Sequence, residues 1–122
     1  MGETQQELLD AESTEPSPNP LTIHTEARGQ GWLVQVGGEL DLATVDALEA
    51  TLTPLAERRI VLDLESLAFI DTCGVSLLQR AYRATHGRLT VERVSPPVDR
   101  MLRMCGVDRM LGLEPVGSEA SS

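Results

Sequence analysis

The spacing of apolar residues changes several times along the chain, and this pattern restricts the fold to a sheet with helices packed against it. Apolar and polar residues alternate over residues 21–25 and 32–36, on either side of a glycine-containing turn at residues 29–31. Alternation around a turn predicts an antiparallel hairpin. The spacing then becomes that of a helix with one apolar face, formed by Val45, Leu48, Leu52 and Leu55.

Two residues mark the limits of this first helix. Thr44 stands where an N-terminal capping residue is expected, and Pro54 lacks a backbone donor and should end or kink the last turn. The next segment, residues 60–64, is an almost uninterrupted apolar run. It predicts a central strand that is covered on both faces.

The second half of the chain repeats the change from helix to strand. A helix is expected from about residue 72 to residue 85 and is closed by Gly87, and alternation over residues 88–94 predicts a strand. Ser95 and Pro96 then supply a cap and a first-turn proline for a third helix. A final half-turn or edge strand is expected over residues 110–113. The apolar stripe of the third helix contains Val98, Met101, Leu102 and Cys105.

The predicted order is β-β-α-β-α-β-α, in one α/β domain over residues 21–115. Strands separated by helices pair in parallel through right-handed crossovers, so we expect a mixed sheet of four to five strands with α-helices packed on it. Residues 1–20 hold five acidic residues, no basic residue and three prolines, which predicts a disordered acidic tail; a short recognition helix at Leu8 and Leu9 is the alternative. A flexible tail is expected over residues 116–122.

The composition argues against several classes of function. The formal net charge is −9, Lys is absent and aromatic residues make up 2% of the chain, so little is available to bind phosphates or stack on bases. We expect no nucleic-acid partner. No apolar run reaches the roughly 18 residues of a membrane span, and the N-terminus lacks a secretory pattern. We therefore expect a cytoplasmic protein with no membrane partner.

The sequence also lacks the usual signs of catalysis. The glycines of residues 29–31 and 37–38 do not have the spacing of phosphate-binding loops, and no nucleophile stands with a base. His24 and His86 have no Cys or carboxylate at ligand spacing. Cys73 and Cys105 are far apart, and we expect two buried or half-buried thiols, with a disulfide between them as the alternative. We therefore expect a binding protein without enzyme activity, cofactor or metal.

The most informative segment is residues 69–75, where Asp71 and Thr72 interrupt apolar sequence as the predicted strand gives way to a helix. One interpretation is structural: Asp71 or Thr72 caps the helix, which contributes about 1 kcal/mol, and Gly74 permits close packing. The other is regulatory, because a helix N-terminus favours an anion and a hydroxyl there can accept a phosphate without unfolding the domain. Phosphorylation would add roughly −1.5 to −2 of charge at pH 7, next to Asp71.

Five segments, taken in order, connect this motif to a known family. They are Gly38-Glu39-Leu40-Asp41 with Thr44, Ile60-Val61-Leu62-Asp63-Leu64, Phe69-Ile70-Asp71-Thr72-Cys73-Gly74-Val75, Ser95-Pro96-Pro97-Val98 and Cys105-Gly106-Val107-Asp108. Over about residues 21–115 the chain thereby resembles the STAS-domain anti-sigma factor antagonists. The resemblance implies a sheet with helices on one side.

The resemblance also implies a function. Members of this family bind, when unphosphorylated, a serine/threonine kinase that doubles as the anti-sigma factor, and so free sigma factor. The kinase phosphorylates the residue after the Asp of a D-[ST]-[SCT]-G motif, which ends binding, and a separate phosphatase restores it. The matching residue here is Thr72. The partner-binding residues that the resemblance implies are Asp41, Leu42, Asp71, Thr72, Cys73, Gly74, Val75 and Ser76.

Two residues depart from the common family pattern. Thr72 stands where Ser is usual and is stiffer about χ1, and Cys73 replaces a second small hydroxyl residue. The alternative function is that of a STAS subunit in a bacterial lipid-transport ABC complex, in which Thr72 would dock against the ATPase. A third interpretation is a scaffold that is not phosphorylated, or a STAS module that binds a nucleotide.

Overall fold

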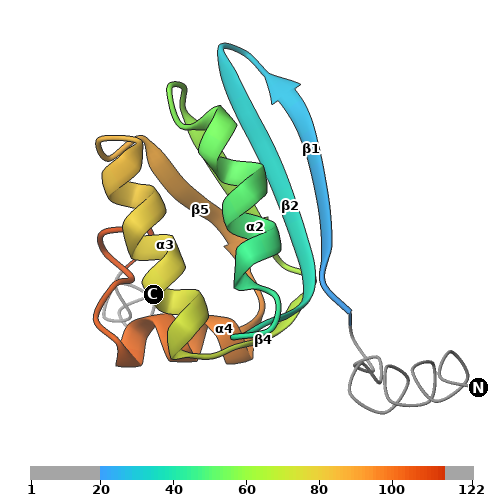
Figure 1. Ribbon diagram of the computed structural model, residues 1–122. Helices are drawn as coiled ribbons and strands as arrows, with labels where there is room; N and C mark the ends of the chain where they lie inside the picture. Colours follow the sequence, from blue (N-terminus) through green and yellow to red (C-terminus); the bar gives the residue numbers. More distant parts are fainter. Residues whose placement is uncertain (1–19, 115–122) are drawn as a thin grey trace, which may run out of the picture.

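Five strands form the sheet in the part of the chain that the computed structural model describes, residues 20–114 (Figure 1). β1 (Thr22–Arg28) and β2 (Gly31–Leu40) form the expected antiparallel hairpin. β2 also pairs in parallel with β3 (Ile60–Leu64), and β3 with β5 (Leu89–Val94). The mixed sheet predicted from the sequence is therefore confirmed. Almost all of the two predicted tails lies outside the described residues.

One strand is missing from the predicted order. β4 (Leu67–Ile70) follows β3 after a short turn and pairs in parallel with the last part of β2, beyond a register shift at Gly38 and Glu39. Its two end residues are buried and the two between them are exposed. This pattern fits neither alternation nor a helix, so the sequence marks the step from strand to helix at Asp71 but does not add a separate strand to the predicted order.

The helices lie over one face of the sheet and at one of its ends. α2 (Val45–Leu52) and α3 (Thr72–Ala84) pack side by side on the sheet, while α4 (Pro96–Met104) crosses the end at which β4 lies (Figure 1). A 3-10 helix over Thr53–Leu55 follows α2 at Pro54, as expected from the missing backbone donor. The second helix begins where the sequence predicts, and its C-terminal turn is closed by Gly87 at a φ of 83°.

The hydrophobic core lies between these helices and the sheet. Full burial of one such aliphatic side chain contributes about 1.5–3 kcal/mol, so this layer is the main source of stability. The largest fully buried side chains are Leu40, Leu48, Ile60, Leu62, Leu64, Leu67, Ile70, Leu77, Leu78, Leu89, Leu102 and Leu111.

The opposite face of the sheet differs from the prediction. β3 is central, but helices cover only one of its faces, and Gln35 and Glu92 on the neighbouring strands are exposed. The buried polar residue on this face is Asp63, whose Oδ2 accepts a hydrogen bond from Nη2 of Arg93 at 2.9 Å. An apolar run broken by one paired aspartate therefore forms a strand with a helix layer on one side.

Three further expectations need correction. Thr44 and Ser95 stand at the N-caps of α2 and α4, but neither side chain caps its helix. The Thr44 hydroxyl instead donates to the carbonyl of Glu39 at 3.0 Å, and that of Ser95 donates to the carbonyl of Leu67. Cys105 is exposed, because α4 ends at Met104 and the residue after it leaves the apolar stripe.

Candidate functional site

The carboxyl ends of β2 and β4 bring the two aspartates of the predicted site together. Leu40 lies opposite Ile70 in the parallel pair, so Asp41 and Asp71 leave neighbouring strands at the same level. Such strands are about 4.8 Å apart. The N–H of Asp71 also donates to the carbonyl of Leu40 at 3.1 Å. The loops that lead into α2 and α3 are therefore joined at one end of the molecule, which we call the Thr72 end (Figure 1).

Asp71 is the capping residue of α3. Its backbone is extended, with a φ of −109° and a ψ of −174°, and its Oδ1 accepts a hydrogen bond from the N–H of Gly74 at 3.1 Å. A cap of this kind contributes about 1 kcal/mol. The sequence allows Asp71 or Thr72 as the cap, and the structure shows that it is Asp71. The hydroxyl of Thr72 therefore takes no part in capping the helix.

Thr72 is the first residue of α3, and its side chain is exposed. Among the described residues, its hydroxyl has no hydrogen-bond partner. The amides of a first helical turn have no carbonyl one turn earlier to bind, so an anion attached here would meet unpaired donors. Thr72 is therefore an accessible hydroxyl at a position that tolerates added negative charge.

Gly74 holds the start of α3 close to the sheet. A Cβ at this residue would lie 2.6 Å from Cγ1 of Ile70 and 3.0 Å from the carbonyl oxygen of Leu40. The first distance is shorter than real Cβ contacts, and the second is tight and involves the backbone of β2. The absence of a side chain is thus what lets Thr72 sit at the end of the sheet.

Asp41 organises the loop between β2 and α2. Its Oδ1 accepts a hydrogen bond from the N–H of Ala43 at 3.0 Å, and its own N–H donates to the hydroxyl oxygen of Thr44 at 2.9 Å. In the described part of the chain, Oδ2 of Asp41 has no partner. One carboxylate oxygen therefore shapes the loop, while the other makes no hydrogen bond within the described residues. The next side chain, Leu42, is 73% exposed.

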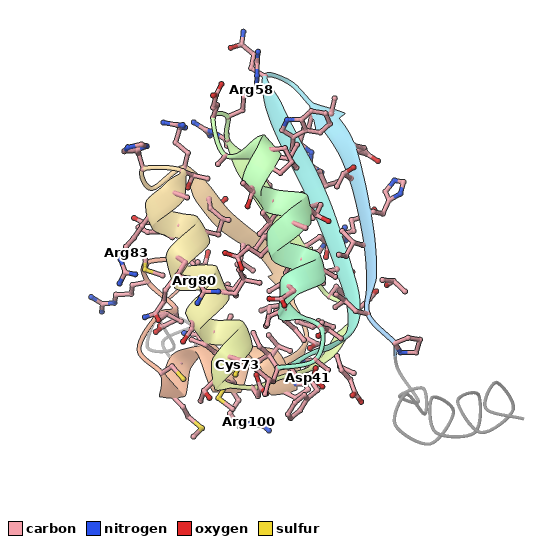
Figure 2. The ribbon with its side chains drawn as sticks, viewed as in Figure 1. Asp41, Arg58, Cys73, Arg80, Arg83 and Arg100 are labelled. Atoms are coloured by element: carbon pink, nitrogen blue, oxygen red, sulfur yellow. The ribbon has the colours of Figure 1, made fainter. Side chains whose placement is uncertain are left out.

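Apolar side chains also reach the surface at this end. The exposed large hydrophobic residues in the described part of the chain are Leu42, Phe69 and Met104, from the loop after β2, from β4 and from α4. Phe69 and Met104 line a shallow hollow together with Arg100, which Figure 2 shows at the same end as Asp41 and Cys73. Exposed apolar groups that gather in one region are typical of a protein-binding surface.

The sequence did not single out Phe69 as a side chain at the surface, nor Met104 as part of the site. A signal for Phe69 was available, since it is the one Phe in the chain and stands two residues before Asp71. Met104 had none, because only the fold brings the end of α4 to the hollow beside β4.

The eight residues predicted to bind a partner lie in two neighbouring segments of the Thr72 end, but they differ in exposure. Leu42, Thr72 and Ser76 are exposed, and Asp41, Asp71 and Cys73 are half-buried. Gly74 and Val75 are buried, and Val75 at 4% exposure offers a partner almost no side-chain surface. The exposed hydroxyls of Thr72 and Ser76 stand one turn apart on α3.

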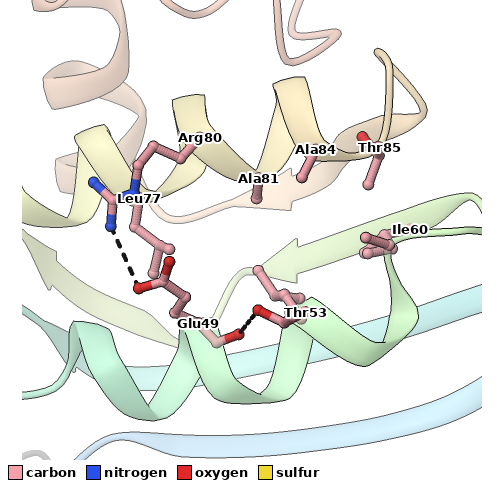
Figure 3. Close-up of a pocket in the computed structure, with 10 residues that line it drawn as sticks. Glu49, Thr53, Ile60, Leu77, Arg80, Ala81, Ala84 and Thr85 are labelled. Atoms are coloured by element: carbon pink, nitrogen blue, oxygen red, sulfur yellow. Dashed lines mark hydrogen bonds and ion pairs between the residues drawn. The ribbon is translucent and has the colours of Figure 1, made fainter.

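A cavity between α2 and α3 offers no evident chemistry. Its lining is mostly apolar, and the ion pair between Glu49 and Arg80, at 3.6 Å, lies across it (Figure 3). Within residues 20–114, no group of three or more His, Cys, Asp or Glu is arranged to hold a metal ion. No helix in that range is long and apolar enough to cross a membrane.

Comparison with known proteins identifies relatives along most of the chain. A family model described as "Mlab, STAS domain" matches residues 23–113. The anti-sigma-B factor antagonist of Staphylococcus aureus is 31% identical over 75% of this chain and 90% of its own. The anti-sigma F factor antagonist of Paenibacillus polymyxa is 33% identical over 75% of this chain and 84% of its own.

A solved structure shares the fold. The crystal structure of an anti-sigma factor antagonist from Mycobacterium paratuberculosis superposes with a TM-score of 0.73 and 25% sequence identity. The match covers 85% of this chain and 93% of the other. The strands and helices that position Thr72 are therefore those of a fold already observed in this class of protein.

Proposed function

The chain belongs to the STAS domain family, and we propose that it is an anti-sigma factor antagonist controlled by phosphorylation of Thr72. In its unphosphorylated state it binds an anti-sigma factor that is a serine/threonine kinase, and this binding frees sigma factor. The kinase phosphorylates Thr72 and so ends the complex, and a serine/threonine phosphatase restores the binding form. The protein has no catalytic role in this cycle.

The observation that carries this proposal is the setting of the Thr72 hydroxyl. It is exposed, has no hydrogen-bond partner among the described residues, and lies at the end where Leu42 and Phe69 reach the surface. A docked kinase would cover these apolar groups and hold the hydroxyl near its bound ATP. The same contact therefore serves both binding and modification.

The charges around Thr72 support the second step of the proposal, in which a phosphate ends binding. Phosphorylation adds roughly −1.5 to −2 of charge at pH 7, beside the carboxylates of Asp71 and Asp41. A partner that accepts the unmodified surface would then have to bury or neutralise this new charge, which is costly without matching cations. The cap between Asp71 and Gly74 does not involve the Thr72 hydroxyl, so the helix can keep its start.

The direct test is incubation of the protein with its candidate kinase and radiolabelled ATP. We expect Thr72→Ala to abolish labelling and Thr72→Ser to keep it. Ser76→Ala is the matched control, because Ser76 is an exposed hydroxyl one turn along the same helix. Labelling of Thr72→Ala at the wild-type level would remove Thr72 as the acceptor.

A pull-down from the native cytosol, with wild-type protein and Thr72→Asp in parallel, tests the partner. Recovery of a serine/threonine kinase by the wild type alone supports the proposal. Recovery of the ATPase of a lipid-transport ABC complex by both proteins would favour the alternative, in which Thr72 is a docking residue.

A further inference from the structure

The end of the molecule opposite Thr72 is basic, although the whole chain has a net charge of −9. A hollow there is formed by the hairpin turn, the loop before β3 and the loop before β5. Figure 2 shows Arg58 at this end, far from Asp41 and Cys73. We call it the arginine end. The arginines that line the hollow are Arg28, Arg58, Arg59 and Arg88.

Most of these guanidinium groups form no ion pair with a carboxylate in the described part of the chain, so their charge is not neutralised. Nη1 of Arg58 donates to the carbonyl of Gln30 at 3.3 Å, and Nη2 of Arg88 donates to the carbonyls of Ala56 and Glu57 at 3.3 and 3.1 Å. A carbonyl holds a guanidinium in place without cancelling its charge. Arg59 has no ion-pair partner in the described part of the chain.

Acidic groups at this end are fewer than basic ones. Arg28 pairs with Glu92 at 3.0 Å, and both side chains are about half exposed. Glu57 adds a carboxylate to the lining of the hollow. Against the four guanidinium groups these two carboxylates leave an excess of positive charge within the described residues.

The backbone around the hollow is fixed. The N–H of Trp32 donates to the carbonyl of Arg59 at 2.8 Å, and the N–H of Ile60 donates to the carbonyl of Arg88 at 3.1 Å. Gly31 also packs so closely against the backbone of Arg59 that a Cβ would not fit. Backbone hydrogen bonds therefore join the three loops that carry these arginines, and a frame that is already assembled lowers the cost of ordering when an acidic chain binds.

We propose that the acidic N-terminal segment of the same chain, residues 3–15, binds the arginine end through its first three carboxylates, those of Glu3, Glu7 and Asp10. This segment holds five carboxylates and no basic residue. The described structure begins at residue 20, so the segment is attached just before Thr22. Thr22 lies opposite Gly37, near the Thr72 end (Figure 1). The Thr72 end carries Asp41 and Asp71, so an acidic segment is repelled where it starts and attracted at the far end.

The length of the segment suits this path. β1 has seven residues and spans about 23 Å at roughly 3.3 Å per residue. Ten extended residues reach about 33 Å, so Asp10 and the acidic residues before it can pass the whole length of β1. Tethering also gives the segment an effective concentration in about the millimolar range, which lets weak exposed ion pairs add up.

Nuclear magnetic resonance can test this contact in the full chain. Because the chain has no Lys, an amine-reactive spin label attaches only to the α-amino group. We expect the label to broaden the amide signals of Gln30, Gly31 and Arg59 more than those of Ala43 and Ser76. The broadening should fade in about 0.5 M salt, where the Debye length is only a few ångströms.

Charge variants decide whether the contact is electrostatic. Neutralising the segment with Glu3→Gln, Glu7→Gln, Asp10→Asn, Glu12→Gln and Glu15→Gln keeps its length and should abolish the selective broadening. Arg58→Glu with Arg59→Glu should do the same. Arg100→Glu with Arg109→Glu changes the net charge equally, at exposed positions that do not line the hollow of the arginine end. This variant should keep the selective broadening.

Three results would overturn the proposal. They are equal broadening at both ends, broadening that survives neutralisation of the segment, and broadening of 15N-labelled protein by a spin-labelled second copy alone. The last result would assign the hollow to the segment of another molecule.

Discussion

The two ends of this sheet share the long strand β2, yet they carry opposite chemistry. At the Thr72 end, carboxylates bind backbone N–H groups, and a hydroxyl and several apolar side chains stay exposed. At the arginine end, guanidinium groups bind backbone carbonyls and keep their charge. The backbone is held firmly at both ends, so the difference lies in what each presents to other molecules. Substitutions should therefore separate partner binding from the contact with the acidic segment.

The largest expected effect is on kinase binding. Thr72→Asp should weaken the complex by at least about tenfold, or about 1.4 kcal/mol, because it places charge among groups that the partner must cover. Arg58→Glu with Arg59→Glu alters charge at the other end and should change the affinity by less than about threefold. Isothermal titration calorimetry measures both. Equal losses for the two variants would mean that the ends do not act separately.

Stability should respond next, and more at the Thr72 end. Gly74→Ala should lower the free energy of unfolding by about 1–3 kcal/mol, because its Cβ would press on Ile70 and on the backbone of Leu40. Gly29→Ala should cost no more than about 1–2 kcal/mol, since nothing lies within 4 Å and only the φ of 58° opposes it. Urea unfolding gives both values. If Gly74→Ala loses less free energy of unfolding than Gly29→Ala does, close packing at Gly74 does not govern the start of α3.

Apolar contacts at the Thr72 end should contribute to binding and little to folding. We expect Phe69→Ala and Met104→Ala each to weaken kinase binding by about 1–2 kcal/mol, because both side chains are exposed in the free protein. Their urea midpoints should stay close to that of the wild type. Unchanged affinity in both variants would move the docking surface away from the hollow beside β4.

The smallest pair of effects compares one polar contact from each end. Asp71→Ala removes the cap of α3 and should cost about 1 kcal/mol. Arg88→Ala removes exposed hydrogen bonds to Ala56 and Glu57 and should stay within about 0.5 kcal/mol. Thermal unfolding followed by circular dichroism resolves this order. The reverse order would mean that the arginines hold the fold together.

Local pattern was enough to predict much of this fold and part of the site. The hairpin, the helices and the step from Asp71 to Thr72 follow from hydrophobic spacing and helix-end chemistry, which act between near neighbours. β4 was missed because its burial depends on β2 and α4 rather than on its own four residues. The place of Met104 in the hollow was missed for the same reason.

The arginine end shows a stronger form of this limit. Its residues lie on the hairpin turn, before β3 and before β5, and each is unremarkable in its own segment. They gather because β2, β3 and β5 run in parallel from the same edge, and the turn that joins β1 to β2 lies at that edge. Such a cluster is a property of topology, so no short sequence window contains it.

The length of β2 has a consequence for how the chain folds. This ten-residue strand pairs with β1 through a tight turn, but with β3 and β4 only after the chain has closed loops that contain α2. Loop closure costs entropy before the distant pairing is gained, and that slows folding relative to all-helical domains. The hairpin can form early, and the parallel half of the sheet then has to assemble on β2.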